Sequence, residues 1–167
     1  VWIGSPRTIK VVDPIFVVIR GIVEMIPARI RLVGSGPVNI DDVPVKVIEW
    51  SEDTEVDLIN RFDVGIMPLQ DTPWQRGKCA LKLIQYMGCG KPVVASPVGI
   101  NDSIIAEDVN GYLATTHDDW VSQLKRIYED IELARQLGIN GRKKVKNEYS
   151  LSVTVPKWQQ IIKDLVE

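Results

Sequence analysis

Three runs of apolar residues, each followed by proline, serine or glycine, constrain the fold of this chain more than any other feature. They cover residues 32–33, 64–67 and 93–95. Strands without polar alternation are typical of a parallel sheet that is covered by helices on both faces. Helical periodicity fills the intervals between the runs. The sequence therefore predicts an α/β fold with a doubly wound, mainly parallel sheet of about six strands.

Strand and helix patterns alternate along most of the chain. Strands are predicted at residues 1–4, 30–33, 45–50, 64–68, 93–96 and 112–114. Asp13 and Pro14 form a typical helix start, and Pro27 ends that helix. From Asp118 onward only helical spacing is found. We therefore expect a body of alternating strands and helices, followed by a helical carboxyl-terminal tail.

Composition and charge exclude several classes of protein. The 167 residues are 45% hydrophobic and 25% charged, which is typical of one globular domain rather than a disordered chain. A balance of 20 basic against 22 acidic residues leaves a formal net charge of −2. Such a chain has no general attraction to nucleic acid, so a bound anion must be held by a local cluster of cations.

Cysteine and histidine content bears on compartment and metal binding. Cys79 and Cys89 lie ten residues apart in one predicted helix, outside disulfide geometry, and are expected to be reduced thiols of a cytoplasmic protein. With one histidine and no paired Cys/His spacing, we expect no metal site. No apolar run reaches membrane-spanning length, and we expect no signal peptide ahead of Val1. The abrupt, strand-like start is expected for a piece of a longer protein.

The segment from residue 77 to residue 96 is the most informative part of the chain. Helical spacing places polar side chains on one face of a predicted helix and apolar side chains on the other. The polar face comprises Lys78, Lys82, Gln85 and Cys89, and the apolar face comprises Ala80, Leu81, Leu83, Ile84 and Met87. The apolar face must be buried, so the lysines point elsewhere. Two lysines in the first turns of a helix oppose its macrodipole, and a bound anion would compensate that cost.

The loop ahead of this helix also favours an anion site. Arg76 adds a third cation, and Gly77 lets a ligand approach the backbone closely. The unpaired N–H groups of a helix start bind anions as well. Together these features predict a cradle for a phosphate or diphosphate. The alternative is that Lys78 and Lys82 form a solvated pair on an exposed helix face.

Small and basic residues collect at the carboxyl ends of the predicted strands, where ligands of open α/β sheets bind. The loops at this edge begin at Gly4, Gly34, Trp50, Pro68 and Ser96. Gly34-Ser35-Gly36 lacks the third glycine of a dinucleotide fingerprint, so NAD binding is not expected. The loop after Ser96 is equally well explained as a tight strand-to-helix turn.

One known family matches this order of motifs. The segments WIGSP, LVGSG, DVGIMPL, KCALKLIQYMGCGKPVVASPVG and NGYLA resemble the carboxyl-terminal, donor-binding domain of a GT-B-fold glycosyltransferase, closest to glycosyltransferase family 4. The resemblance covers nearly the whole chain and is most specific from Lys82 to Gly99. It implies that residues 1–150 form a Rossmann-like donor-binding domain. Residues 151–167 would then be a helix that packs on this domain or toward a missing acceptor domain.

The resemblance also implies an activity and partners. Members of the family transfer a sugar from a nucleoside-diphosphate sugar to an acceptor, with retention at the anomeric carbon, no cofactor and usually no metal. The expected enzyme is a glycosyltransferase of the hexosyltransferase class, incomplete in this chain because an amino-terminal acceptor-binding domain is missing. We expect a cytoplasmic protein, and peripheral membrane association through the missing domain would place it at the inner face of the membrane.

Carried over residue by residue, the resemblance assigns three groups of site residues. The donor diphosphate would bind Gly4, Ser5, Arg7, Lys78 and Lys82. The nucleoside would bind Gly34, Trp50, Ser51 and Gln85. The donor sugar would lie beside Arg76 and Gly77. No catalytic residue and no metal ligand are assigned in this domain.

The chain departs from the family pattern at several positions, and Ser5, Arg7 and Thr8 replace the Arg and Lys that often follow the first strand. Gly77 and Gln85 stand where many members have two glutamates, the first for the donor sugar and the second for the ribose. Gln85 can still accept a hydrogen bond from one hydroxyl and donate to another. Two other functions are carried as alternatives. One is a non-catalytic nucleotide- or anion-binding module that regulates a partner, and the other is a GT-B-like enzyme such as a nucleotide-sugar epimerase.

Overall fold

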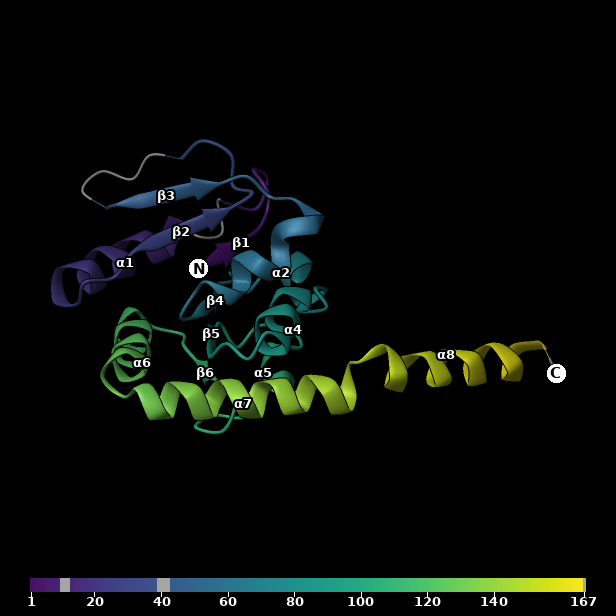
Figure 1. The fold of residues 1–167 in the computed structure, drawn as a ribbon. Helices are drawn as coiled ribbons and strands as arrows, with labels where there is room; N and C mark the ends of the chain where they lie inside the picture. The colour runs from purple at the N-terminus through teal and green to yellow at the C-terminus, as the bar shows by residue number, and fades with distance from the viewer. Residues whose placement is uncertain (10–12, 39–42, 167) are drawn as a thin grey trace.

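The computed structural model describes residues 1–9, 13–38 and 43–166, and it confirms the predicted α/β class (Figure 1). All of the strand pairs in these ranges are parallel. The strands are β1 (Trp2–Ile3), β2 (Ile30–Val33), β3 (Val45–Ile48), β4 (Gly65–Met67), β5 (Val93–Ala95) and β6 (Tyr112–Leu113).

The strands form two three-stranded sheets rather than one continuous sheet. One sheet has the order β1-β2-β3 and the other has the order β4-β5-β6. The sheets meet at β1 and β4, where the Ile66 N–H donates to the Val1 carbonyl at 2.8 Å and the Val1 amino group donates to the Val64 carbonyl at 2.6 Å. Hydrogen bonds from one residue to two residues that lie two positions apart on the neighbouring strand are typical of a parallel pair. The carboxyl ends of both sheets therefore face the same edge of the molecule.

Helices connect the strands and cover them on both sides. They are α1 (Asp13–Met25), α2 (Glu52–Asn60), α3 (Pro73–Arg76), α4 (Leu81–Gly88), α5 (Asn101–Ile104), α6 (His117–Glu129), α7 (Ile131–Glu148) and α8 (Leu151–Val166). In Figure 1, α1 and α6 lie on one side of the strands, and α2 and α4 lie on the other. Within the described ranges, none of these helices has both the length and the apolar character needed to span a membrane.

Two apolar clusters fill the space between strands and helices. One cluster includes Leu32 of β2 and Trp120 of α6, and the other includes Val33 of β2 and Leu83 of α4. Successive residues of β2 thus enter opposite clusters, because side chains alternate across a strand. Both faces are buried, which explains why the run that predicted β2 contains no polar residue.

The lysine-bearing helix is shorter than the sequence predicts. α4 begins at Leu81, because Ala80 has a left-handed backbone conformation with φ of 52°. Lys78 therefore lies in the loop before the helix, and Leu81, predicted on the buried face, is 55% exposed. The macrodipole argument consequently applies to Lys82 alone of the two lysines.

Helix α8 extends away from the rest of the molecule (Figure 1). It contacts α7, but none of its described residues is buried. Its exposed apolar side chains are Leu151, Val155, Trp158, Ile161, Ile162, Leu165 and Val166. The helical tail predicted from the spacing is thus present, with an apolar surface that the chain itself does not cover.

Candidate functional site

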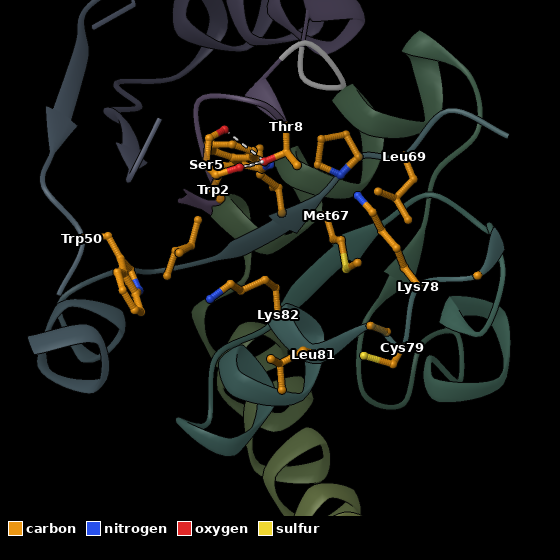
Figure 2. Close-up of a pocket in the computed structure, with 16 residues that line it drawn as sticks. Trp2, Ser5, Thr8, Trp50, Met67, Leu69, Lys78, Cys79, Leu81 and Lys82 are labelled. Atoms are coloured by element: carbon orange, nitrogen blue, oxygen red, sulfur yellow. Dashed lines mark hydrogen bonds between the residues drawn. The ribbon is translucent and has the colours of Figure 1, made fainter. Parts of the chain in front are cut away.

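A pocket of about 580 Å³ lies at the carboxyl edge of the strands, where β1 and β4 meet (Figure 2). Six of the predicted site residues line it, namely Gly4, Ser5, Trp50, Gly77, Lys78 and Lys82. The other predicted residues, Arg7, Gly34, Ser51, Arg76 and Gln85, are not among its lining residues. The fold therefore brings together residues from three predicted loops and from the start of α4.

The loop after β1 is a closed turn that Ser5 and Thr8 build. The Ser5 N–H donates to Thr8 Oγ1 at 2.9 Å, and the Thr8 hydroxyl donates to the Ser5 carbonyl at 3.0 Å. The N–H of Gly4 donates to the carbonyl of Val33 at 3.0 Å. Both of these backbone donors are thus used within the protein. The Gly4 and Ser5 N–H groups are therefore not free to bind a ligand.

Two glycines allow the strand ends around the pocket to lie close together. A Cβ atom on Gly4 would come within 2.3 Å of the ring of Trp2. A Cβ atom on Gly34 would come within 2.4 Å of the Gly4 carbonyl oxygen and 3.0 Å of Trp50 Cβ, and Gly34 has a positive φ of 74° that favours glycine. Gly34 therefore brings Trp50 next to the end of β1, although it does not line the pocket.

Lys82 and Lys78 enter the pocket from the first turn of α4 and from the loop before it. In Figure 2, the amino group of Lys82 points toward Trp50, whereas that of Lys78 lies farther from Trp50, near Met67 and Leu69. Burial lowers the pKa of Lys78. Within the described ranges, no carboxylate forms an ion pair with Lys78. An anion bound in the pocket would replace the interactions with water that this ammonium group has lost.

Glu55 of α2 links the segment after β3 to α4, although it is not among the site residues predicted from the sequence. Its buried carboxylate accepts hydrogen bonds from Trp50 Nε1 at 2.9 Å, Lys82 Nζ at 2.6 Å and Gln85 Nε2 at 2.6 Å. Burial raises the pKa of Glu55, but these hydrogen bonds and the charge of Lys82 outweigh burial and hold the pKa below its usual value. Glu55 is therefore ionised at neutral pH and neutralises Lys82. Trp50, Glu55, Lys82 and Gln85 are called the Glu55 cluster below.

One signal in the sequence points to Glu55. It precedes Ile59 by four residues and Phe62 by seven, and both of these apolar residues are buried. Helical spacing therefore places Glu55 on the buried face of α2. An acidic residue on such a face needs partners, and the polar side chains of α4 provide them.

Gln85 has one half of its amide committed to Glu55. A carboxylate only accepts hydrogen bonds, so it fixes the Gln85 NH₂ group toward itself. The Gln85 Oε1 atom is buried and has no hydrogen-bond partner among the described residues. This oxygen is thus an unused hydrogen-bond acceptor in the described structure, although Gln85 does not line the pocket.

The third predicted cation, Arg76, is paired with Asp71. The Arg76 Nε and terminal nitrogen donate to the two carboxylate oxygens at 2.5 and 2.8 Å, with both side chains exposed. The hydrogen bond raises the pKa of Arg76 and lowers that of Asp71. Of the cations predicted around the anion, Lys78 is thus the one that lines the pocket without a carboxylate partner in the described part of the chain.

The reduced state of the two cysteines and the absence of a metal site were also predicted from the sequence. Cys79 and Cys89 are free thiols, and Cys79 is exposed and lines the pocket. Burial raises the pKa of Cys89. In residues 1–9, 13–38 and 43–166, no group of three His, Cys, Asp or Glu residues is close enough to hold a metal ion.

A second cavity, of about 840 Å³, lies at the opposite edge, around the amino ends of β1, β2, β4 and β5. Basic side chains line it, namely those of Arg29, Arg31, Arg61, Lys91 and Arg135. Asp63 lines it as well, and Lys91 donates to the carbonyl of Asn60 at 2.8 Å. The sequence analysis assigned no site to this edge.

Two solved structures illustrate the fold that this chain shares. Sucrose-phosphate synthase from Thermosynechococcus elongatus superposes with a TM-score of 0.79 at 20% identity, over 99% of this chain and 45% of that chain. HepE from Anabaena, solved in complex with UDP-glucose, superposes with a TM-score of 0.68 at 20% identity, over 89% of this chain and 44% of that chain. The predicted likeness to one half of a GT-B fold is thereby confirmed.

Sequence comparison agrees with the structural one. The chain is 23% identical over 179 residues to N-acetyl-alpha-D-glucosaminyl L-malate synthase of Bacillus anthracis, a match that covers 99% of this chain and 45% of that protein. The chain thus spans about half the length of the relatives that it matches. The family described as "Glycosyl transferases group 1" matches residues 1–130, which is most of the sequence. The chain therefore belongs to the group 1 glycosyl transferases.

Proposed function

We propose that this chain is the donor-binding domain of a retaining glycosyltransferase of the hexosyltransferase class. Its donor would be a UDP- or GDP-sugar, and its acceptor would bind a further, amino-terminal domain. The observation that carries the proposal is the pocket at the carboxyl edge. There a desolvated, unpaired ammonium group and a half-exposed indole face the same space, which suits a phosphate joined to a base. HepE, which shares the fold, was solved with UDP-glucose.

The diphosphate is best accommodated beside Lys78. Its ammonium group is partly desolvated and has no carboxylate partner in the described ranges, so an anion gains a charge-assisted hydrogen bond there. Lys82 also lines the pocket and adds a donor at the start of α4. Cations and helix N–H groups held in place before the reaction stabilise the charge that develops on the leaving diphosphate.

The nucleoside is best accommodated at Trp50. The side chain lines the pocket and the residue is 49% exposed, while the hydrogen bond to Glu55 fixes the edge of its indole. A ring held in this way offers a face on which a base can stack. The Oε1 atom of Gln85, which has no hydrogen-bond partner among the described residues, is the proposed acceptor for a ribose hydroxyl.

Helix α8 is part of the same proposal. Its apolar side chains are exposed, and an acceptor domain packed against them would remove that surface from water. The expected location is the cytoplasm, with the acceptor domain as the route to the inner face of a membrane.

A second candidate is a nucleotide-binding module without catalytic activity. In the described ranges, no carboxylate or imidazole lines the pocket, so a proton donor or acceptor would have to come from the acceptor or from another domain. A module that only binds nucleotide needs no such group.

Calorimetry on the intact protein with UDP, GDP and their sugars tests the proposal, together with product analysis by NMR. We expect micromolar to millimolar binding of one nucleotide and a product that keeps the anomeric configuration of the donor. Binding without transfer to any acceptor would favour the non-catalytic module. Inversion at the anomeric carbon would contradict the retaining mechanism, and absence of nucleotide binding would contradict both candidates.

A further inference from the structure

Glu55 occupies a position that a purely structural residue would not need. It comes from α2, yet its three hydrogen-bond donors come from the end of β3 and from α4. Two of these donors, Trp50 and Lys82, line the pocket, whereas Glu55 itself does not. The carboxylate thus lies behind the pocket and controls side chains that face it.

The net contribution of this carboxylate to stability is expected to be small. Removing a carboxylate and an ammonium group from water costs about as much free energy as their attraction returns. Glu55 is only 7% exposed, so this balance between desolvation and attraction applies to it. Its stronger effect is on geometry, since three donors at 2.6 to 2.9 Å fix one indole, one ammonium and one amide.

Glu55 also sets the charge of the pocket. The Glu55–Lys82 pair has no net charge, and Arg76 is paired with Asp71 outside the pocket lining. A bare phosphate therefore meets one uncompensated cation, Lys78, among the described side chains. One such contact binds a small inorganic anion weakly. A nucleotide adds contact with Trp50, whose orientation Glu55 maintains.

We propose that Glu55 is a specificity-determining residue that makes the pocket select a nucleoside diphosphate over inorganic phosphate and diphosphate. It does so in two ways: it cancels the charge of Lys82, and it fixes the indole of Trp50, which lines the pocket. This inference rests on the proposed function of the pocket. It concerns which anion is preferred rather than whether an anion binds.

The test compares wild type with Glu55→Gln and with a matched control, Glu52→Gln. Glutamine keeps the size of Glu55 but lacks its charge and one of its acceptor oxygens. Glu52 is an exposed acid on the same helix, one turn earlier, so its substitution removes the same charge from the same element. Affinities of the intact protein for UDP, GDP and inorganic diphosphate are measured by calorimetry at one ionic strength. Glu55→Asp is added, since it keeps the charge.

We expect Glu55→Gln to bind inorganic diphosphate about tenfold more tightly, the effect of one unit charge a few Å from an anion in a solvated pocket. UDP or GDP binding should stay unchanged or weaken, so the preference for nucleotide falls by tenfold or more. Glu52→Gln should keep the wild-type preference, and Glu55→Asp should keep most of it.

Three outcomes overturn the inference. The first is a wild type without preference for nucleotide over diphosphate, and the second is a preference that stays unchanged in Glu55→Gln. The third is an equal loss of preference in Glu52→Gln. Each is distinguishable from failure of the proposed function, in which the wild type binds no nucleotide at all. Circular dichroism of each variant separates a changed preference from unfolding, since an unfolded variant loses affinity for every ligand.

Discussion

The two edges of the sheets carry very different combinations of charge and shape. At the carboxyl edge, a pocket of about 580 Å³ has two lysines in its lining, and one of them is neutralised by Glu55. At the amino edge, a cavity of about 840 Å³ has four arginines and a lysine in its lining. By size and number of cations, the amino edge would be the better anion site.

The number of cations at an edge therefore does not by itself identify an anion-binding site. At the amino edge, Arg29, Arg61 and Arg135 are exposed, and exposed guanidinium groups are well solvated and screened by salt. At the carboxyl edge, Lys78 is partly desolvated. An anion therefore gains more from one desolvated lysine than from several solvated arginines.

The largest effect on ligand binding is expected for Lys78→Ala. Loss of a charge-assisted hydrogen bond to phosphate should weaken UDP or GDP binding by roughly 1.5–3 kcal/mol, which is about 10- to 150-fold. Stability should not fall, because Lys78 forms no ion pair in the described structure and loses a desolvation cost. Calorimetry and thermal melting measure the two quantities. Unchanged nucleotide affinity would remove Lys78, and with it the main cation of the carboxyl edge, from the site.

Lys82→Ala should instead affect stability first. It leaves the buried Glu55 carboxylate without its charged partner, a loss of about 1–3 kcal/mol in the free energy of unfolding. Lys125→Ala is the matched control, because Lys125 forms an exposed pair with Glu129 on α6, and such pairs contribute under about 1 kcal/mol. Urea denaturation at neutral pH provides the comparison. Equal effects of the two substitutions would mean that the Glu55–Lys82 pair is as weak as a surface pair.

The same pair predicts a pH dependence. The pKa of Glu55 in the folded protein is below the usual 4.5, so its ionisation contributes stability above pH 4.5. That contribution is lost as pH falls through the lower, folded pKa. In Lys82→Ala, Glu55 stays buried but loses the contacts with Lys82 that lower its pKa, so this contribution should shrink. Urea midpoints between pH 7 and the acid transition should therefore change less in the variant; an identical pH profile would contradict the link.

The fold could be predicted from the sequence because its strongest signals are local. Both faces of β2 and β5 are buried, so apolar runs mark them directly. The start of α4 could not be predicted in this way. An alanine disfavours the left-handed conformation by about 1–2 kcal/mol, so nothing local indicates that Ala80 adopts it. The surrounding structure imposes that conformation and places Lys78 in a loop.

The surroundings of the candidate site could be predicted only in part for a related reason. Helical spacing places Lys82 and Gln85 on one helix face, and the family resemblance assigns Gln85 to the nucleoside. It does not indicate which side chain of another helix they meet. Glu55 lies 27 residues before Lys82 and 30 before Gln85, and only the packing of α2 beside α4 brings them together. The neutralisation of Lys82 therefore could not be read from the sequence.

A smaller effect is expected for Gln85→Leu. The variant loses the hydrogen bond to Glu55, which should lower the free energy of unfolding by about 1 kcal/mol. It should also lose discrimination between UDP and 2′-deoxy-UDP, or between the corresponding guanine nucleotides, if Oε1 accepts from the ribose. Titrations of wild type and variant with each pair provide the test. Equal discrimination in both proteins would place the ribose elsewhere, while the loss of stability would still report the Glu55 contact.

The smallest effect is expected at the amino edge, for the double substitution Arg29→Ala and Arg135→Ala. Both side chains are exposed, and the pair that Arg135 forms with Glu132 at 3.6 Å is a surface pair. Salt screens exposed charges over a Debye length of roughly 8 Å, and the nucleotide is proposed to bind at the opposite edge, so its affinity should change by less than about twofold. The comparison with Lys78→Ala is decisive, because the double variant removes twice the charge. If it weakens nucleotide binding more than Lys78→Ala does, the anion binds at the amino edge, and solvated arginines outweigh one desolvated lysine after all.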